Sequence, residues 1–222
     1  IEPSGDEEQF VGNIKKVMEN LSGRLKGYCL AFNPVGVYKT EYLNSLPDTA
    51  KELGCDPDYN GWSQQLNETP DSTVNYRTAA GHIHIGLPYQ TDQPTSRHHF
   101  NLCCTLAREL DFYLALPFVA QADEDLLQKE RLRREMYGKA GAFRPKPYGL
   151  EYRALSNHWL SNENLMRFVY RNTCKAVEKV ANHEAVQNEY DSSLIQTIVN
   201  QGLKDEAMKI CNKQNLEVPN AY

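Results

Sequence analysis

The chain has 222 residues, 41% of them hydrophobic and 24% charged, which is ordinary globular usage. Its formal net charge of −5 argues against a general nucleic-acid binder, and no apolar run approaches the length of a membrane span. The six cysteines form no C-x-x-C pair, which predicts reduced thiols of an intracellular protein rather than a zinc ribbon.

The first predicted element is an amphipathic helix near the N-terminus. Ser4 with Glu7 three residues later is a capping-box pattern. Phe10, Ile14 and Leu21 follow at helical spacing, so one face of this helix is expected to be apolar.

A strand is predicted next, at residues 25–32 (LKGYCLAF). Residues 36–73 show weak periodicity and several prolines, which predicts an irregular segment with a short helix near 48–53. Three aromatic residues are expected to anchor this segment to the core: Tyr42, Tyr59 and Trp62.

The stretch GHIHIG predicts a strand over residues 78–87, with alternating side chains. His82 and His84 then share one face, and Ile83 and Ile85 share the other. Two imidazoles on one face can lean toward a common metal ion. A half-exposed strand that carries two histidines without a chemical role fits this segment equally well.

Two helices are predicted after this strand. The first covers residues 96–116 and ends at Pro117, with Cys103 and Cys104 as small buried side chains. The second covers the charged segment 123–138, which ends in glycine.

Residues 139–149 read as a loop, and 150–157 as a strand on which Glu151 and Arg153 share a face. The segment 129–153 carries eight basic and three acidic residues, a local charge of +5. This indicates an anionic ligand, although a solvated helix face followed by a basic loop would give the same pattern. No phosphate-binding glycine loop occurs, so a nucleotide site would lie on the sheet face.

The remaining chain predicts helices at residues 163–181, 192–201 and 204–212, and a frayed tail from residue 216. The expected fold class is α+β.

Three segments together resemble the phage-type COOH–NH2 ligases, or amidoligases, of the glutamine synthetase-like superfamily. They read GCDPDYNGW, NYRTAAGHIHIG and RREMYGKAGAFRPKPYGLEYRALSNHWL. The resemblance runs from near the start to about residue 160. It implies an antiparallel sheet with a concave active-site face backed by helices, a catalytic domain at 1–160, and a helical extension at 161–222 packed on it.

The implied reaction is ATP-dependent: a carboxylate is activated as an acyl-phosphate, and an amine then forms the amide. The implied partners are ATP, Mg²⁺ or Mn²⁺, and a small-molecule or peptide acid and amine, with no nucleic acid or membrane. By this resemblance the site residues are His82, His84 and Glu151 as metal ligands, Arg144 and Arg153 as catalytic arginines, and Arg131, Arg134 and Lys146 on the nucleotide side. Arg77 and Asn157 are weaker candidates.

The family's acidic first strands have no counterpart here, so the metal site is expected to be incomplete in this chain. A further segment, a second copy or a partner chain is expected to cover the edge of the sheet. The alternative function is a non-catalytic relative that serves as a binding or structural component, for instance in a virion; the enzyme itself would act in the cytoplasm of the host. A metal-dependent hydrolase is a third interpretation, and it leaves the arginines without a role.

Overall fold

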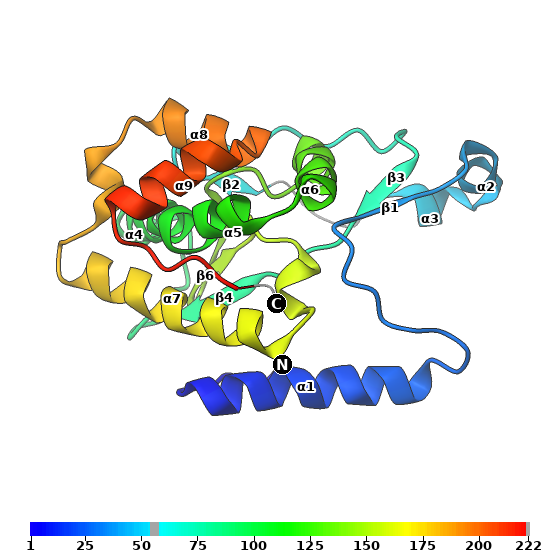
Figure 1. The fold of residues 1–222 in the computed structure, drawn as a ribbon, viewed down its shortest axis with the longest axis horizontal. Helices are drawn as coiled ribbons and strands as arrows, with labels where there is room; N and C mark the ends of the chain where they lie inside the picture. The colour runs from blue at the N-terminus through cyan, green and yellow to red at the C-terminus, as the bar shows by residue number, and fades with distance from the viewer. Residues whose placement is uncertain (54–57, 221–222) are drawn as a thin grey trace.

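Helices and short antiparallel strands make up an α+β fold in the computed structural model, which describes residues 1–53 and 58–220 (Figure 1). The strands are β1 (Val35–Val37), β2 (Tyr59–Asn60), β3 (Tyr76–Thr78), β4 (Ile83–Gly86), β5 (Ala142–Lys146) and β6 (Gly149–Tyr152). The helices are α1 (Glu7–Arg24), α2 (Thr40–Ser45), α3 (Asp48–Lys51), α4 (Arg97–Leu110), η1 (Asp111–Ala115), α5 (Leu116–Gln121), α6 (Glu124–Met136), η2 (Asn157–Leu160), α7 (Glu163–Ala181), η3 (Val186–Glu189), α8 (Ser192–Gln201) and α9 (Lys204–Lys213).

The central sheet has the strand order β2-β5-β6-β4, and every neighbouring pair is antiparallel. Strands β1 and β3 form a separate two-stranded ribbon. The strand predicted over residues 78–87 is therefore split between the two sheets. The antiparallel α+β class is confirmed, while the glutamine synthetase-like form of the sheet stays a prediction.

Strand β5 lies where the sequence predicts a loop, and that prediction is wrong. Pro145 cannot donate a backbone hydrogen bond, which argues against a central strand. Among the described residues, β2 pairs only with Ala142 and Phe143, so the strand neighbour of Pro145 within them is β6. A proline is tolerated on such an edge.

Gly149 opens β6 opposite Gly86 of β4. Its φ is +151°, and an added Cβ would lie 2.0 Å from the carbonyl oxygen of Ile85. We therefore expect Gly149→Ala to lower the free energy of unfolding by roughly 2–4 kcal/mol, through backbone strain and this clash. Urea denaturation would measure the loss. Gly86→Ala is the matched control, because an added Cβ there meets nothing within 4 Å; equal losses in both variants would contradict the explanation.

Helix α4 packs across the apolar face of the sheet and contributes Cys103, Cys104 and Leu106 to the core. It continues through the π-helical turn η1 into α5, although the sequence predicts an end at Pro117. Pro117 lacks an N–H group and its ring needs room in the preceding turn. The wider π turn supplies that room, so the helical segment continues past the proline.

Asp111 in the π turn ties three segments together although its side chain is fully buried. Its carboxylate accepts hydrogen bonds from Trp62 Nε1 at 2.6 Å and from the Tyr152 hydroxyl at 2.8 Å. The backbone N–H of Gly141 donates to it as well. Burial raises the pKa of Asp111 to about 6 against the opposing effect of these donors.

This raised pKa predicts a pH-dependent stability. The contribution of Asp111 is fully present below the pKa of the unfolded chain, near 3.8, and is lost as pH rises through about 6. The loss should amount to a few kcal/mol, at about 1.4 kcal/mol per pKa unit. Chemical denaturation at pH values from 4 to 7 would show the unfolding free energies of wild type and Asp111→Asn drawing together as pH rises. A constant difference would contradict the assignment.

Arg133 of α6 is fully buried and joins two strand ends. Its guanidinium donates to the carbonyl oxygens of Ala79 (3.1 Å), Arg153 (3.1 Å), Ala154 (2.8 Å) and Leu155 (2.9 Å). Burial lowers its pKa to about 10, so it remains charged at neutral pH. These contacts place the residues after β6 beside the residues before β4.

Helix α1 forms as predicted, but Asp6 caps it rather than Ser4, since the Asp6 carboxylate accepts from the Gln9 N–H. Helix α1 runs alongside α7 (Figure 1), and ion pairs join the two helices. Arg167 pairs with Glu7 at 3.1 Å and also with Glu8, and Lys15 pairs with Glu163 at 3.0 Å. These partners are partly exposed to solvent.

Two predictions for the chain between α1 and β2 are wrong: the strand at residues 25–32, and Tyr42 as an anchor to the core. Residues 25–32 form no strand, because they are mostly exposed and pair with no other strand in the described parts of the chain. The next segment contains α2 as well as the expected short helix α3. Tyr42 is 54% exposed and anchors nothing in the core, whereas Tyr59 and Trp62 pack against it as predicted.

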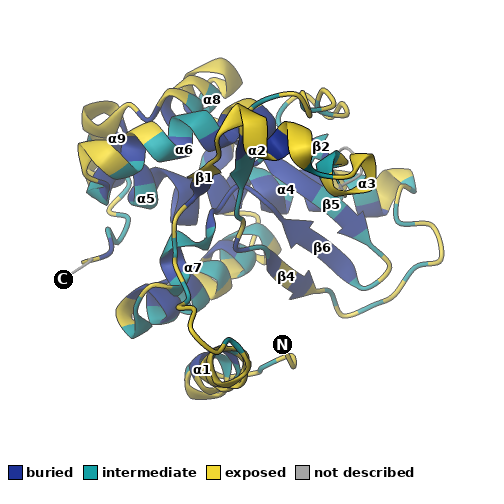
Figure 2. Cartoon of the chain, turned by 90° about the vertical axis from the view of Figure 1, so that its right-hand side faces the viewer, coloured by how far each residue is buried: buried dark blue, intermediate teal, exposed yellow. Residues whose placement is uncertain are grey.

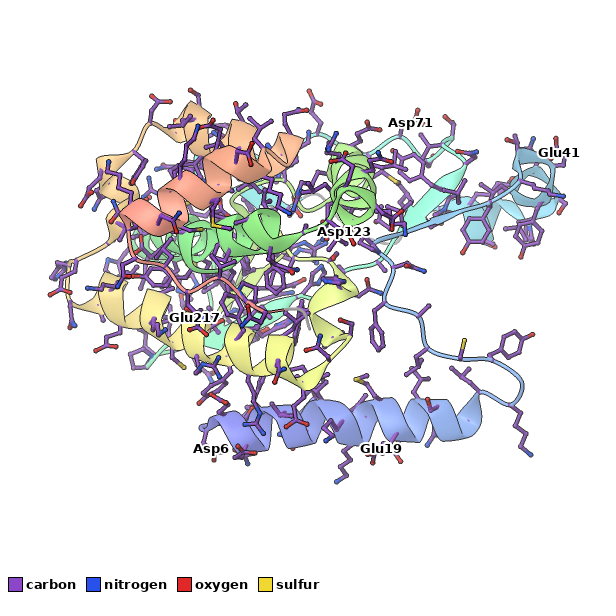
Figure 3. All side chains as sticks on the ribbon, in the orientation of Figure 1. Asp6, Glu19, Glu41, Asp71, Asp123 and Glu217 are labelled. Atoms are coloured by element: carbon purple, nitrogen blue, oxygen red, sulfur yellow. The ribbon has the colours of Figure 1, made fainter. Side chains whose placement is uncertain are left out.

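The three C-terminal helices lie where the sequence predicts them. The tail is not frayed over its described residues: Leu216 and Val218 pack against the core. Between them, Glu217 lies against α7 (Figure 3). Its carboxylate accepts from Arg171 at 2.9 Å and from Lys175 at 3.0 Å. One continuous core includes side chains from both sides of residue 160.

Candidate functional site

The central sheet has one apolar and one polar face. Ile83, Ile85, Phe143, Leu150 and Tyr152 are buried on the apolar side. Arg144, Glu151 and His84 form a row across the other side, because each is a register partner of the next. Alternation along the chain adds three more residues to this side. We call the resulting set the polar sheet face: His82, His84, Arg144, Lys146, Glu151 and Arg153. Figure 2 shows β4 and β6 between α1 and α2 in that view.

Glu151 is the centre of the polar sheet face and is 4% exposed. Its carboxylate contacts Nδ1 of His82 at 2.8 Å, Nζ of Lys146 at 2.9 Å, and Nη1 of Arg153. Burial alone would raise the pKa of Glu151. The hydrogen bonds from His82 and Lys146, together with the charge of Arg153, hold that pKa well below its ordinary value. Glu151 is therefore an anion held by three donors.

Arg153 lies deeper than the sequence suggests, at 3% exposure. Its Nε donates to Oδ2 of Asp58 at 2.9 Å, while its Nη1 reaches Glu151. Asp58 is also buried and accepts from Nδ2 of Asn67 at 2.7 Å. Arg153 thus joins two carboxylates in the interior.

His84 lies on the same face but has a different partner. Its Nδ1 is 2.5 Å from the hydroxyl of Tyr148, which belongs to the turn between β5 and β6. Burial lowers the pKa of His84, and the charges of His82, Lys146 and Arg153 act in the same direction against the effect of Glu151. The imidazole is therefore mainly neutral at neutral pH.

The predicted ligands His82, His84 and Glu151 do not form a closed coordination site for a metal ion. Within residues 1–53 and 58–220, no three His, Cys, Asp or Glu side chains are placed to hold one together. His82 and Glu151 are in contact, but both carboxylate oxygens of Glu151 already meet cationic or imidazole groups. The predicted ligand set of His82, His84 and Glu151 stays a prediction.

The three residues predicted to bind the nucleotide, Arg131, Arg134 and Lys146, do not form one site. Lys146 lies on the polar sheet face, whereas Arg131 and Arg134 lie on α6 and contact Glu124 and Glu130 of the same helix. The two weaker candidates bond to backbone: Arg77 donates to the Val74 and Tyr76 carbonyls, and Asn157 to that of Ala31.

Several contributors were missed from the sequence. Asp58 lies within GCDPDYNGW, but nothing there indicates that it faces Arg153. Tyr148 lies in a proline-containing turn, where the sequence pattern does not show that its hydroxyl faces His84. His99 is buried on α4, and one of its ring nitrogens lies 3.1 Å from the carbonyl oxygen of Gly149, so it contacts the start of β6 from the apolar side and is not part of the polar sheet face. The other acid of GCDPDYNGW, Asp56, lies outside the described residues.

Comparison with known families settles the relationship of this chain. The family model of phage phiEco32-like COOH–NH2 ligase-type 2 proteins matches residues 68–219, which is more than half of the chain. The chain belongs to this family. No curated protein and no solved structure matches it.

Membership of this ligase family places the chain among proteins named for joining a carboxylate to an amine. The matched segment contains every residue of the polar sheet face and also α7 to α9, so it crosses the expected domain boundary at residue 160. None of the helices in the described parts is long and apolar enough to cross a membrane.

Proposed function

We propose that this member of the ligase family is an ATP-dependent carboxylate–amine ligase that works through an acyl-phosphate. The observation that carries the proposal is the polar sheet face. Lys146 and Arg153 contact one ionised carboxylate there, Glu151, and Arg144 is its register partner on β5, all within the matched segment. Cationic side chains at a solvent-shielded site stabilise charge that develops on a transferred phosphoryl group.

In the proposed first step, a carboxylate oxygen attacks the γ-phosphorus of ATP, the bond from that phosphorus to the bridging oxygen breaks, and ADP leaves. The amine nitrogen then attacks the acyl carbon. The acyl carbon–oxygen bond breaks, phosphate leaves with its electron pair, and the nitrogen loses a proton. Both steps place negative charge on phosphoryl oxygens, which is where arginine and lysine are useful.

Arg144 and Lys146 are only partly buried, so a substrate reaches them more easily than it reaches Arg153. The side chain of Lys146 is 26% exposed, whereas that of Arg153 is 4% exposed. We therefore assign substrate or phosphate contact to Arg144 and Lys146. Arg153 holds Glu151 in place through the contact between their side chains.

A divalent cation, Mg²⁺ or Mn²⁺, remains part of the proposal. Mg²⁺ is commonly held by one or two carboxylates and by the phosphates of its nucleotide, not by an all-protein cage. One carboxylate next to one imidazole is consistent with that mode of binding. His82 and Glu151 are the residues that would contact it.

Hydroxylamine trapping tests the proposal, since an acyl-phosphate and hydroxylamine form a hydroxamate. The full chain would be incubated with ATP, Mg²⁺, hydroxylamine and a panel of small dicarboxylic and amino acids. We expect hydroxamate and ADP in equal amounts with at least one acid, and neither product without ATP.

The contacts that already occupy both carboxylate oxygens of Glu151 favour the alternative, a non-catalytic relative with a binding or structural role. Calorimetric titration with ATP and Mg²⁺ separates the two. The ligase must bind the nucleotide, and a chain that binds none and traps no hydroxamate is the non-catalytic relative.

A further inference from the structure

His84 has no role in the reaction steps proposed above, although it ends the row that it forms with Glu151 and Arg144. The residue is exposed, so a bound molecule can reach it. Its Nδ1 lies 2.5 Å from the hydroxyl of Tyr148, and its Nε2 has no hydrogen-bond partner among the described residues. The ring therefore has one nitrogen held by the protein and one nitrogen open to a ligand.

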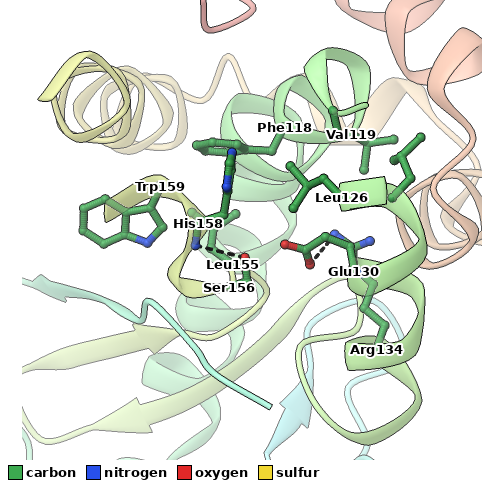
Figure 4. Close-up of a pocket in the computed structure, with 11 residues that line it drawn as sticks. Phe118, Val119, Leu126, Glu130, Arg134, Leu155, Ser156, His158 and Trp159 are labelled. Carbon is green, nitrogen blue, oxygen red and sulfur yellow. Dashed lines mark hydrogen bonds and ion pairs between the residues drawn. The ribbon is translucent and has the colours of Figure 1, made fainter. Parts of the chain in front are cut away.

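A substrate must reach this ring from the open side of the sheet. Figure 4 shows the cavity between α5, α6 and η2, whose wall is mainly apolar. Its volume of about 20 Å³ has room for about one water molecule. None of the six residues of the polar sheet face lines this cavity, so it brings no substrate to His84.

Tyr148 is held in place by the backbone around it. It follows Pro147 in the turn between β5 and β6, and the proline ring restricts the conformation of that turn. The N–H of Leu87 donates to the carbonyl oxygen of Tyr148 at 2.7 Å, and the N–H of Thr91 donates to that of Pro147 at 2.9 Å. The turn is thus tied to the residues that follow β4, the strand of His84, so the hydroxyl is positioned against the imidazole.

A second tyrosine–histidine pair in the same molecule shows how such a contact sets the tautomer. Nε2 of the buried His99 lies 3.1 Å from the carbonyl oxygen of Gly149, and its Nδ1 lies 3.2 Å from the hydroxyl of Tyr89. A carbonyl oxygen only accepts hydrogen bonds, so Nε2 of His99 carries the hydrogen. In the neutral ring Nδ1 is then the acceptor, and Tyr89 donates to it. At His84 the tyrosine is present, and the place that the carbonyl takes at His99 is open within the described residues.

We propose that Tyr148 is a positioning residue for the ligase reaction: its hydroxyl donates to Nδ1 of His84, which leaves Nε2–H to donate to an anionic oxygen of a bound substrate, phosphoryl or carboxylate. The oxygen of a phenol is a weak acceptor because its lone pair is shared with the ring, whereas an unprotonated imidazole nitrogen accepts well. In this tautomer neither nitrogen of His84 can bind a metal ion, which leaves that role to His82 and Glu151. The inference rests on the proposed function, since the ligase substrates supply the anionic oxygen.

Nitrogen NMR of the histidine rings in the full chain at pH 8 measures the tautomer directly, with His84→Gln to assign the signal. We expect the wild-type ring to carry its hydrogen on Nε2. Tyr148→Phe removes only the hydroxyl, so the His84 signal should move toward the mixture of both tautomers that free neutral histidine shows. A hydrogen on Nδ1 in wild type, or an unchanged His84 signal in folded Tyr148→Phe protein, would overturn the inference.

Titrations identify the oxygen that Nε2–H meets. A shift of the His84 signal with ATP and Mg²⁺ indicates a phosphoryl oxygen, and a shift with the acid that yields hydroxamate indicates a carboxylate oxygen. If neither compound shifts the signal, His84 is not a donor to the substrate.

Tyr148→Phe should also lower ATP-dependent hydroxamate formation about tenfold, with little change in melting temperature. Tyr89→Phe is the matched control, because it removes a tyrosine hydroxyl from His99 and leaves His84 untouched. Its His84 signal and its activity should equal those of wild type. If wild type traps no hydroxamate, the ligase proposal fails whatever the tautomer. If wild type traps hydroxamate and Tyr148→Phe keeps full activity, Tyr148 is not a positioning residue.

Discussion

Arg133→Met is expected to lower the free energy of unfolding by about 3–5 kcal/mol, the range seen when one partner of a buried charged contact is removed. Methionine keeps much of the volume but leaves the carbonyls of Ala79, Arg153, Ala154 and Leu155 without this donor. Because those carbonyls flank β4 and β6, the loss should also loosen the polar sheet face.

Urea denaturation of the full chain measures this effect. Arg131→Met is the matched control on the same helix, since the Arg131 side chain is 40% exposed and pairs with Glu124 at the surface. Its cost should stay within about 1 kcal/mol. Similar losses for Arg131 and Arg133 would show that the backbone contacts of Arg133 contribute little.

Arg144→Ala is expected to reduce ATP-dependent hydroxamate formation at least about 100-fold, the usual cost of removing one donor aimed at developing charge. Arg144 is only partly buried, at the end of the row that it forms with Glu151 and His84, so the melting temperature should change little. Trapping assays and thermal melts on the same preparation measure both quantities. Arg24→Ala, at the exposed end of α1, is the control for loss of an arginine.

Arg153→Ala should behave differently. Its removal leaves Asp58 and Glu151 buried without the arginine between them, so both stability and activity should fall. Normal ATP turnover by folded Arg144→Ala protein would show that this arginine is not part of the reaction.

The polar sheet face could be anticipated in part because β4 and β6 each alternate polar and apolar residues. Period-two alternation identifies which side chains share a face without any knowledge of the neighbours. The register then brings His84, Glu151 and Arg144 into one row. The position of Arg144 in this row could not be predicted, because Pro145 and the flanking glycines give β5 the sequence pattern of a loop.

The sequence alone could not predict side-chain contacts between segments that lie far apart along the chain. Asp58 contacts Arg153, which follows it by 95 residues, and Trp62 contacts Asp111, which follows it by 49 residues. A lone acid in a weakly patterned loop looks the same whether it faces solvent or an arginine. The π turn before Pro117 is similar, since the local pattern shows only the helix breaker and not the room that the core leaves for it.

The ion pairs between α1 and α7 divide the electrostatics of this molecule into two parts. Mobile ions reach Arg167, Glu8 and Lys15, so their attraction weakens as added salt shortens the Debye length from about 8 Å at physiological salt to about 3 Å at 1 M. The contacts of Arg153 lie below the surface and are screened far less. Rising ionic strength should therefore release the N-terminal helix first, and its ten-residue connection to β1 (residues 25–34) would then be the first segment open to proteases.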